Sequence, residues 1–311
     1  MLYEYAVDPS VFESWSSYSY VMPDVSIEKG RFISQFPKDW KNRAKKIIEQ
    51  NLKKKKIKPV EKKRLIEKLI QIDSKLFNLN NRSFRFDEAT SWLENASNSD
   101  KKLPFQAIIS KINPDNNPRI LKVGEFDKED NNLWNIKTQA SINRNAEDMV
   151  NVAKNLIKIS SRFIFIDPHF SPHEKRFQQP LKNFLALIKK TTKSPIIEYH
   201  IQNNTKNIKL LLNSLKNNIP QICPKDITIE FIIWKEFKYY EKEGKGKRLH
   251  PRFLLTELTG ILYENGLDES DGDITPVLLL EKDLYKKYLS RFSIDESPLI
   301  QIDSFKLVGT A

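Results

Sequence analysis

The sequence predicts an α/β fold for residues 101–311, preceded by a smaller, mainly helical region in residues 1–100. From residue 105 onward, short apolar segments alternate with amphipathic ones, which indicates a mixed or parallel sheet with helices on its faces. Before residue 100, apolar residues recur every three or four positions, as they do in helices. Between the two patterns, the polar run NASNSDKK (95–102) is typical of a linker.

Three helices are expected in the N-terminal region. Residues 39–51 predict a short basic helix, and residues 60–77 predict a longer one with an apolar face. Pro59 suits the first turn of that longer helix. The third helix is expected over residues 87–96.

The elements expected after the linker follow in chain order. They are a hairpin of 105–112 with 120–123, a helix over 146–157, a strand over 162–167, a helix opened by Pro180, a strand over 196–201, a helix over 208–215, a strand over 227–234, a hairpin of 248–257 with 259–266, a strand over 277–281, a helix around Leu284 and Tyr288, and a final strand over 298–308. Because strands and helices alternate, we expect one sheet covered by helices.

Composition excludes several classes of protein. The 311 residues are 39% hydrophobic and 30% charged, which is a globular balance. No apolar run approaches the roughly 18 residues that span a bilayer, so we expect no integral membrane segment. The opening residues lack the basic and then apolar order of a signal peptide. The single cysteine, Cys223, excludes an internal disulfide and a structural zinc site. We expect a cytoplasmic protein without a metal or other cofactor.

Positive charge is concentrated in one segment. The chain carries 52 Lys and Arg against 40 Asp and Glu, and residues 41–68 alone contain thirteen basic residues against three glutamates. This surplus favours contact with nucleic acid or an acidic lipid surface, although a Lys-, Asn- and Ile-rich composition is also what an AT-rich genome produces. The candidate nucleic-acid contacts are Lys53, Lys54, Lys55, Lys56, Lys245, Lys247 and Arg248.

The best candidate for chemistry follows the second basic segment. His250 and Arg252 are two positions apart on an expected strand, so their side chains share one face. Glu257 stands at the end of that strand. Histidine suits proton or phosphoryl transfer, arginine suits phosphate oxygens, and a carboxylate can orient an imidazole.

These residues resemble a known family. HPRFLLTE (250–257) resembles the His-x-Lys…Asp motif of the phospholipase D superfamily, with Arg for Lys and Glu for Asp. NGLD (265–268) and FIDPHF (165–170) are similar to the version of this fold found at the C-terminus of MIT-domain proteins and in bacterial phage-defence operons. The resemblance covers approximately residues 105–311 and gives no account of residues 1–100.

The resemblance implies a metal-independent attack by one histidine on phosphorus, with a second histidine protonating the leaving oxygen. It implies His250 as nucleophile or acid, Arg252 as phosphate clamp and Glu257 as the orienting carboxylate. Two departures leave catalysis open. Arginine has a larger fork than the usual lysine, and Glu264-Asn265-Gly266-Leu267 stands where active members have Gly-Ser-x-Asn.

The reaction needs two histidines, whereas the chain has one motif. A homodimer sharing one site, or a second histidine without a motif, would complete the pair. His200 shares a strand face with Glu198, and the alternative for it is a core histidine paired with that glutamate. Asp167 ends an apolar strand, where it lines a ligand crevice or caps the next helix. His169 and Asn265 are further candidates.

We therefore expect a phospholipase D-like protein that engages the phosphodiester backbone of nucleic acid. The resemblance implies a nucleic-acid-binding or nuclease component of bacterial anti-phage defence, with other defence proteins as partners. The alternative is a catalytically dead scaffold or adaptor that docks a protein partner or an anionic membrane. The absence of a second motif favours the scaffold, and the basic segments favour nucleic acid.

Overall fold

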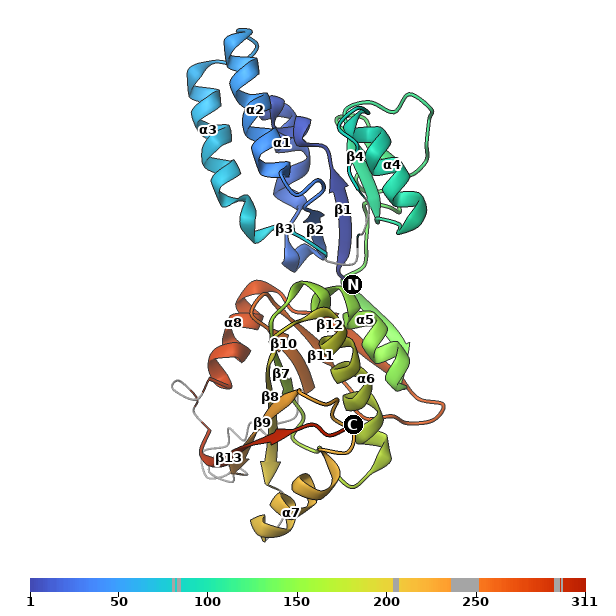
Figure 1. Cartoon of the computed structure of the whole chain (residues 1–311), viewed down its shortest axis with the longest axis vertical. Helices are drawn as coiled ribbons and strands as arrows, with labels where there is room; N and C mark the ends of the chain where they lie inside the picture. Colours follow the sequence, from blue (N-terminus) through green and yellow to red (C-terminus); the bar gives the residue numbers. More distant parts are fainter. Residues whose placement is uncertain (80–81, 83–84, 204–206, 236–251, 294–296, 298) are drawn as a thin grey trace. The chain divides into compact units, whose positions relative to one another are not determined.

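The computed structural model describes residues 1–79, 82, 85–203, 207–235, 252–293, 297 and 299–311, which form two compact units (Figure 1). The N-terminal unit is Leu2–Lys137 and the C-terminal unit is Thr138–Ala311. The described residues contain two sheets and eight α-helices, which confirms the mixed α/β class. The boundary lies at 137/138, not at the expected 100/101, because two strands after residue 100 complete the first sheet.

The N-terminal unit is a parallel sheet with helices on both faces. Its elements are β1 (Tyr3–Val7), α1 (Trp15–Val21), β2 (Arg31–Ser34), α2 (Trp40–Lys53), α3 (Pro59–Ile70), β3 (Leu76–Phe77), α4 (Trp92–Lys102), β4 (Ala107–Ser110) and β5 (Ile120–Lys122). The strand order is β3-β2-β1-β4-β5, and all four pairings are parallel. Residues 1–100 contain more helix than strand, as predicted, but the prediction missed that they also form β1, β2 and β3 of this sheet.

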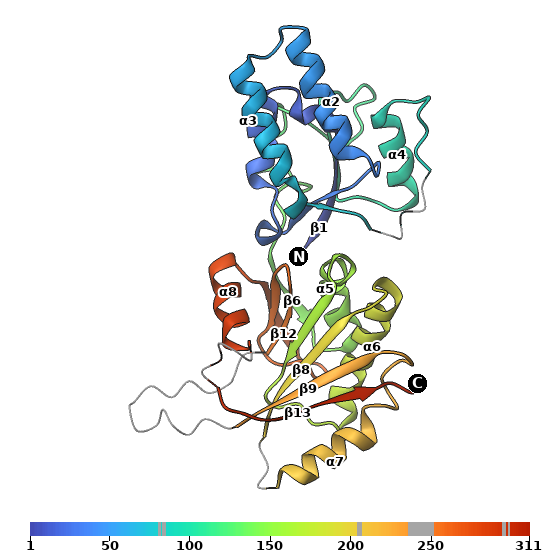
Figure 2. The ribbon, with the colours of Figure 1, turned by 60° about the vertical axis from the view of Figure 1, so that its left-hand side comes forward.

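Alternating residues of these strands fill two separate cores. Tyr5 and Val7 pack in the core that also contains Trp40 of α2. Ala6, between them in sequence, packs in the core that contains Leu93 of α4. Figure 2 shows α2 and α3 on one side of β1 and α4 on the other. The strands are buried on both faces and only two to five residues long, so they lack the alternating pattern by which a strand is recognised in sequence.

The segment expected to be a linker belongs to α4. Asn95 is 1% exposed, and its side-chain amide donates to the Asp87 and Ser91 carbonyls and the Thr90 hydroxyl. Its carbonyl accepts from the Asp87 N–H. Because these hydrogen bonds satisfy a buried amide, a polar sequence here forms packed structure.

Two other predictions for this unit need correction. β4 and β5 pair in parallel, so they are not the expected hairpin. The nine residues between them, 111–119, can extend roughly 30 Å, which is enough to return past a four-residue strand. The helix expected over 60–77 ends at Ile70, and Leu76 and Phe77 form β3 instead.

The C-terminal unit is built on an eight-stranded mixed sheet. Its elements are β6 (Gln139–Asn143), α5 (Ala146–Ile159), β7 (Arg162–Ile166), α6 (Lys175–Thr191), β8 (Ile196–Asn203), α7 (Ile208–Asn218), β9 (Thr228–Lys235), β10 (Arg252–Thr256), β11 (Gly260–Tyr263), β12 (Ile274–Leu279), α8 (Lys282–Arg291) and β13 (Gln301–Val308). The order is β13-β9-β8-β7-β10-β11-β12-β6. β7, β8 and β9 are parallel, and the other pairings are antiparallel, including the expected hairpin of β10 with β11.

The two faces of this sheet bury different side chains. Ile166, Trp234 and Phe253 pack with residues of α8 in one core. On the opposite face, Phe165 packs edge-on against Phe184 of α6. No helix in the described part of the chain is both long and apolar enough to cross a membrane.

Helix α6 begins at Lys175, five residues before the proline that was expected to open it. Pro180 has no N–H, so the Arg176 carbonyl four residues earlier receives no hydrogen bond from it. The backbone N–H of Glu269 donates to that carbonyl instead, at 2.9 Å. The proline therefore leaves an acceptor on α6 that holds the loop between β11 and β12.

Candidate functional site

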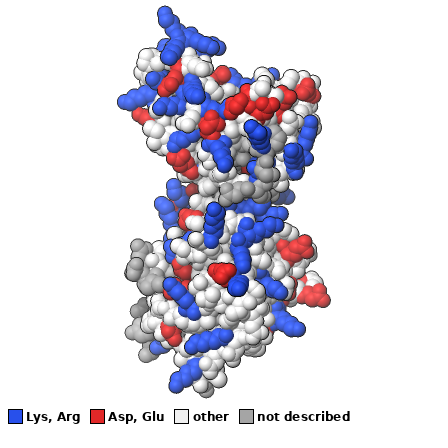
Figure 3. Space-filling model, in the orientation of Figure 1, with Lys and Arg blue, Asp and Glu red and all other residues white. Residues whose placement is uncertain are grey.

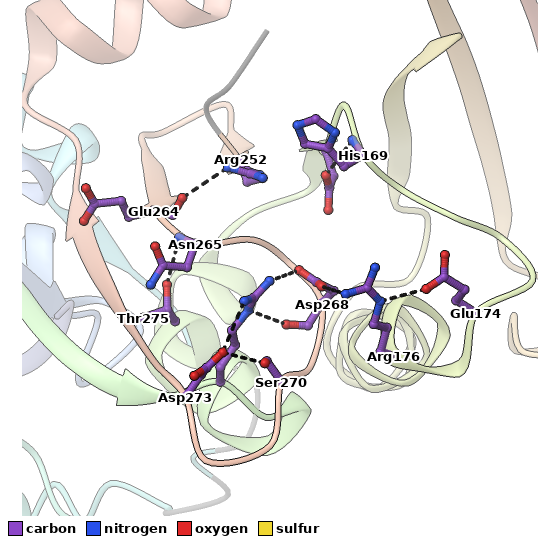
Figure 4. Close-up of polar contacts among 12 residues, drawn as sticks. His169, Glu174, Arg176, Arg252, Glu264, Asn265, Asp268, Ser270, Asp273 and Thr275 are labelled. Carbon is purple, nitrogen blue, oxygen red and sulfur yellow. Dashed lines mark hydrogen bonds and ion pairs between the residues drawn. The ribbon is translucent and has the colours of Figure 1, made fainter. Parts of the chain in front are cut away.

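Polar side chains gather at the edge of the C-terminal sheet where β7 ends and β10 begins. The two strands are antiparallel neighbours, with Ile166 beside Phe253. Asp167 directly follows β7 and Arg252 is the first residue of β10, so they stand at the same edge. Figure 4 draws Arg252, His169 and the loop around Asp268 at this edge. The expected position of Asp167, at the end of an apolar strand, is consistent with this arrangement.

Asp167 is a buried carboxyl group with one unsatisfied oxygen. Its side chain is 1% exposed, and Oδ1 accepts the His169 backbone N–H at 3.0 Å. Oδ2 has no hydrogen-bond partner in the part of the chain that the structure describes. Burial raises the pKa of Asp167 to about 6, against the opposing effects of the His169 N–H and the Arg252 guanidinium. A substantial fraction of the side chain is therefore protonated just below neutral pH.

Arg252 is a partly buried cation that no described carboxylate pairs with within 4 Å. Its Nη1 donates to the Glu264 carbonyl at 3.3 Å. Its Nε is buried without a hydrogen-bond partner among the described residues. The partly exposed part of this guanidinium can donate to an anionic oxygen group, such as a phosphate.

A network of ion pairs holds the loop that joins β11 to β12, which lies at this edge. Asp268, 4% exposed, pairs with Arg144 through Oδ1 and with Arg176 through Oδ2, the latter at 3.2 Å. Arg144 Nε also donates to the Asp268 carbonyl at 3.1 Å, and Arg176 Nε donates to Glu174 at 2.8 Å (Figure 4). The network ties this loop to α6 and to the segment before α5.

Sequence reasoning missed both arginines of this network, since they lie far from Asp268 along the chain. The signal that could have pointed to Asp268 is Gly266, two positions earlier. Gly266 has φ +135°, and a Cβ there would overlap Asp268 Oδ1 and lie 2.8 Å from Arg144 Nη2. Asn265 fixes the same turn, because its N–H and Nδ2 donate to Thr275 Oγ1 and the Ile274 carbonyl. The amide of Asn265 is thus used by the fold.

Glu257 lies at the other end of β10 from Arg252. Its carboxylate accepts the backbone N–H groups of Ser161 and Arg162 at 2.6 and 3.0 Å, where β7 begins. The five residues of β10 separate it from Arg252 by roughly 17 Å. The expectation that Glu257 shares a site with Arg252 was wrong, because the length of β10 separates the two residues. Since β10 runs antiparallel to β7, Glu257 lies where β7 begins and Arg252 lies where β7 ends.

His200 belongs to the core on the α8 face. It is 1% exposed, stacks on Trp234, accepts the indole N–H at Nδ1 (3.1 Å) and lies 3.3 Å from Glu198 Oε2 through Nε2. Burial lowers its pKa against the pull of Glu198. Burial raises the pKa of Glu198, but bonds from His200 and Arg162 outweigh it and hold that pKa below its usual value. Of the two alternatives, the core histidine paired with Glu198 describes this geometry.

Several predicted site residues lie outside the described residues. They are His250, Lys245, Lys247 and Arg248. His169 is described, and its exposed side chain stands at the Arg252 edge (Figure 4). The structure therefore places His169, not His200, at the sheet edge where β10 begins with Arg252. No group of three or more His, Cys, Asp or Glu side chains suited to a metal ion occurs among the residues that are described.

The predicted lysine contacts form the tip of the helical hairpin α2–α3. Lys53, Lys54, Lys55 and Lys56 are exposed, and none pairs with a described acidic residue. Figure 3 shows basic side chains gathered over this tip. Lys55 has φ +56°, a left-handed conformation that favours glycine.

Neither a protein-family model nor a curated protein matches this chain. Among solved structures, it is similar to TrmBL2, described as an archaeal chromatin protein with a novel mode of DNA binding, at 8% sequence identity and a TM-score of 0.29. The similarity covers 51% of this chain and 49% of that one, so the chain spans about half the length of this neighbour. Similarity of this degree establishes neither a shared fold nor a shared function.

Proposed function

We propose that this protein binds nucleic acid through its phosphodiester backbone. The observation that carries the proposal is the partly exposed guanidinium of Arg252, which pairs with no described carboxylate and stands at the same sheet edge as the exposed His169 (Figure 4). A phosphate group supplies an acceptor for the Arg252 guanidinium.

The lysine tip supports nucleic acid as the source of that phosphate. Four exposed, unpaired cations on successive residues suit a polymer with regularly spaced charges. Lys55 keeps a side chain where glycine would be less strained, a cost of about 1 kcal/mol. A cation retained at such a position supports a role in binding.

The finer part of the proposal is a phospholipase D-like site in the C-terminal unit. Its motif residues, His250 and Arg252, are two positions apart in sequence. His169 stands at the same edge as Arg252 (Figure 4). We propose His169 and His250 as the two histidines of a metal-independent cleavage, with Arg252 as the phosphate clamp. Service in anti-phage defence with protein partners, and a homodimer, remain predictions from the resemblance.

Two substitutions test the proposal. Arg252→Ala should weaken the binding of a single-stranded oligonucleotide by about 1.5 to 3 kcal/mol, because it removes a charge-assisted phosphate contact. His250→Ala should leave affinity nearly unchanged but abolish any cleavage, and EDTA should not inhibit that cleavage. Fluorescence anisotropy measures the affinities, and gel analysis of the oligonucleotide measures cleavage.

The control is Arg162→Ala, which removes an arginine paired with Glu198 at the opposite end of β7. It should bind as the parent does. If Arg252→Ala also binds as the parent does, the Asp167–Arg252 edge is not a phosphate site. Cleavage that needs Mg²⁺ would contradict the histidine mechanism.

The second candidate is the scaffold or adaptor. The placement of His200 and Glu257 favours it, because neither stands with Arg252 and both are engaged elsewhere. A scaffold that docks on membranes would bind phosphatidylserine vesicles and not oligonucleotides. A scaffold that docks on a protein would bind neither vesicles nor oligonucleotides. Arg252→Ala and His250→Ala would then leave the activity of its complex with that protein unchanged.

A further inference from the structure

A second candidate site lies in the N-terminal unit, at the carboxyl edge of its parallel sheet. The chain proceeds from β1 toward β2 and β3 on one side, and from β4 toward β5 on the other. In open α/β sheets such a reversal of strand order opens a crevice beyond the strand ends, where ligands bind. Asp8 follows β1 here, and its Oδ2 lies 3.5 Å from the hydroxyl of Ser110, the last residue of β4.

A pocket of about 330 Å³ opens at this point, between the end of β1, helix α2 and the start of α4. Its lining includes the partly buried Asp8, Ile47 and Trp92 and the exposed Lys46 and Gln50. This volume is at the lower end of the range for small-molecule sites. It suits a ligand of the size of one nucleotide better than a dinucleotide.

The polar groups of the pocket are not equivalent. Arg43 is already neutralised, since it pairs with Asp39 at 2.9 Å and with Glu88. Lys46, one turn along α2, pairs with no described acidic residue. The indole of Trp92 is held in place by its N–H, which donates to the Phe36 carbonyl at 3.0 Å. The pocket thus combines a fixed aromatic surface, the unpaired Lys46, the Asp8 carboxylate and an Arg43 whose charge Asp39 and Glu88 offset.

Asp8 has room for a ligand as well as its present partners. Its Oδ1 accepts the Ser10 N–H at 2.8 Å, and among the described residues its Oδ2 accepts only the 3.5 Å bond from the Ser110 hydroxyl. A carboxylate oxygen can accept two hydrogen bonds, so it can take a hydroxyl donor from the pocket.

We propose that this pocket binds a nucleoside monophosphate. The base packs against Trp92 and Ile47, a ribose hydroxyl donates to Asp8, and the phosphate is held by Lys46 with Gln50 beside it. This ligand is distinct from the nucleic acid of the proposed function, and the residues that bind it are different. The N-terminal unit thereby gains a role in binding a nucleotide.

The test uses the full chain and the four nucleoside 5′-monophosphates as probes. Isothermal titration calorimetry should show saturable binding of at least one of them below about 1 mM. Binding should quench tryptophan fluorescence, and Trp92→Phe should remove that quenching. Lys46→Gln should weaken binding about tenfold, because it removes a charged phosphate contact.

Lys45→Gln is the matched control, since Lys45 is the exposed neighbour of Lys46 on α2 and does not line the pocket. It should bind the nucleotide as the parent does. Replacing Lys53 to Lys56 with glutamine should also leave nucleotide binding unchanged, which separates this site from the nucleic-acid proposal. The proposal is overturned if none of the four nucleotides binds at concentrations up to about 10 mM, which is roughly ten times the expected upper limit of Kd. It is also overturned if Lys45→Gln weakens binding as much as Lys46→Gln, or if inorganic phosphate alone binds as tightly as the nucleotide.

Discussion

At the scale of single residues, Asp167 is a carboxyl group of the candidate site that the fold buries almost completely. Its position was predictable, because a carboxylate after an apolar strand marks a sheet edge in sequence. Its partners were not, since Arg252 comes from a strand 85 residues later. The expectation that Glu257 stands with Arg252 failed for the same reason, because the direction of a strand depends on which strands pair. For His200, the alternative of a core histidine paired with Glu198 agrees with the structure.

Replacing Asp167 tests the shifted pKa. A carboxyl group whose pKa is raised to about 6 in the fold contributes stability that is present below its unfolded pKa of 3.8 and is lost as pH rises through 6. Asp167→Asn cannot ionise, so at pH 7 it should stabilise the C-terminal unit by on the order of 2 kcal/mol. The gain should shrink toward zero as pH falls to about 4.

Thermal unfolding of parent and variant at pH 7 and pH 4.5 measures this difference. The control is Asp271→Asn, an exposed carboxylate in the loop between β11 and β12. Its effect should be small at both pH values. A gain from Asp167→Asn that is the same at both pH values would show that burial does not raise the pKa of Asp167.

At the scale of elements, long amphipathic helices and the apolar strands of the C-terminal unit were predictable. α5, β7, α7 and the β10–β11 pair all lie where periodicity placed them. The failures have a common cause. In α4, Asn95 is buried and fully hydrogen-bonded, and in α6, Pro180 is tolerated because another segment uses the freed carbonyl. Hydrogen bonds of particular polar groups stabilise both elements, and the periodicity of apolar residues does not reveal such bonds.

The turn between α2 and α3 provides a prediction at this scale. Lys55→Gly should raise the stability of the N-terminal unit by about 1 kcal/mol, because glycine relieves a left-handed residue. The same change should weaken nucleic-acid binding, because it removes one phosphate contact. Thermal unfolding and anisotropy measure the two effects.

Lys54→Gly is its matched control. Lys54 has φ −77°, so glycine there relieves no strain and should lower stability while removing the same charge. Opposite effects on stability with similar losses of binding are the expected result. If Lys55→Gly binds as tightly as the parent, the lysine at this turn does not contact nucleic acid.

At the scale of the whole molecule, the boundary between the units is the main departure from expectation. Ile108 and Ile109 of β4 are fully buried in the N-terminal unit, so a cut at 100/101 would expose both them and the edge of β1. Fragments 1–137 and 138–311 should each unfold cooperatively on heating, whereas 1–100 should be insoluble or unfolded. A soluble, cooperatively folded fragment 1–100 would contradict the assignment of β4 and β5 to the first sheet.

The central claim is that the chain holds nucleic acid by its phosphates, and the salt dependence of binding tests it most directly. Log Kobs for a single-stranded oligonucleotide should fall linearly with log salt concentration, because bound phosphates release counterions. Replacing Lys53, Lys54, Lys55 and Lys56 with glutamine should flatten that slope by up to roughly 0.7 per lost contact. A control with the same loss of charge on exposed lysines of other helices, Lys209, Lys282, Lys286 and Lys287, should keep the parent slope. If the parent shows no salt-dependent binding, or if both variants flatten the slope equally, the claim is contradicted.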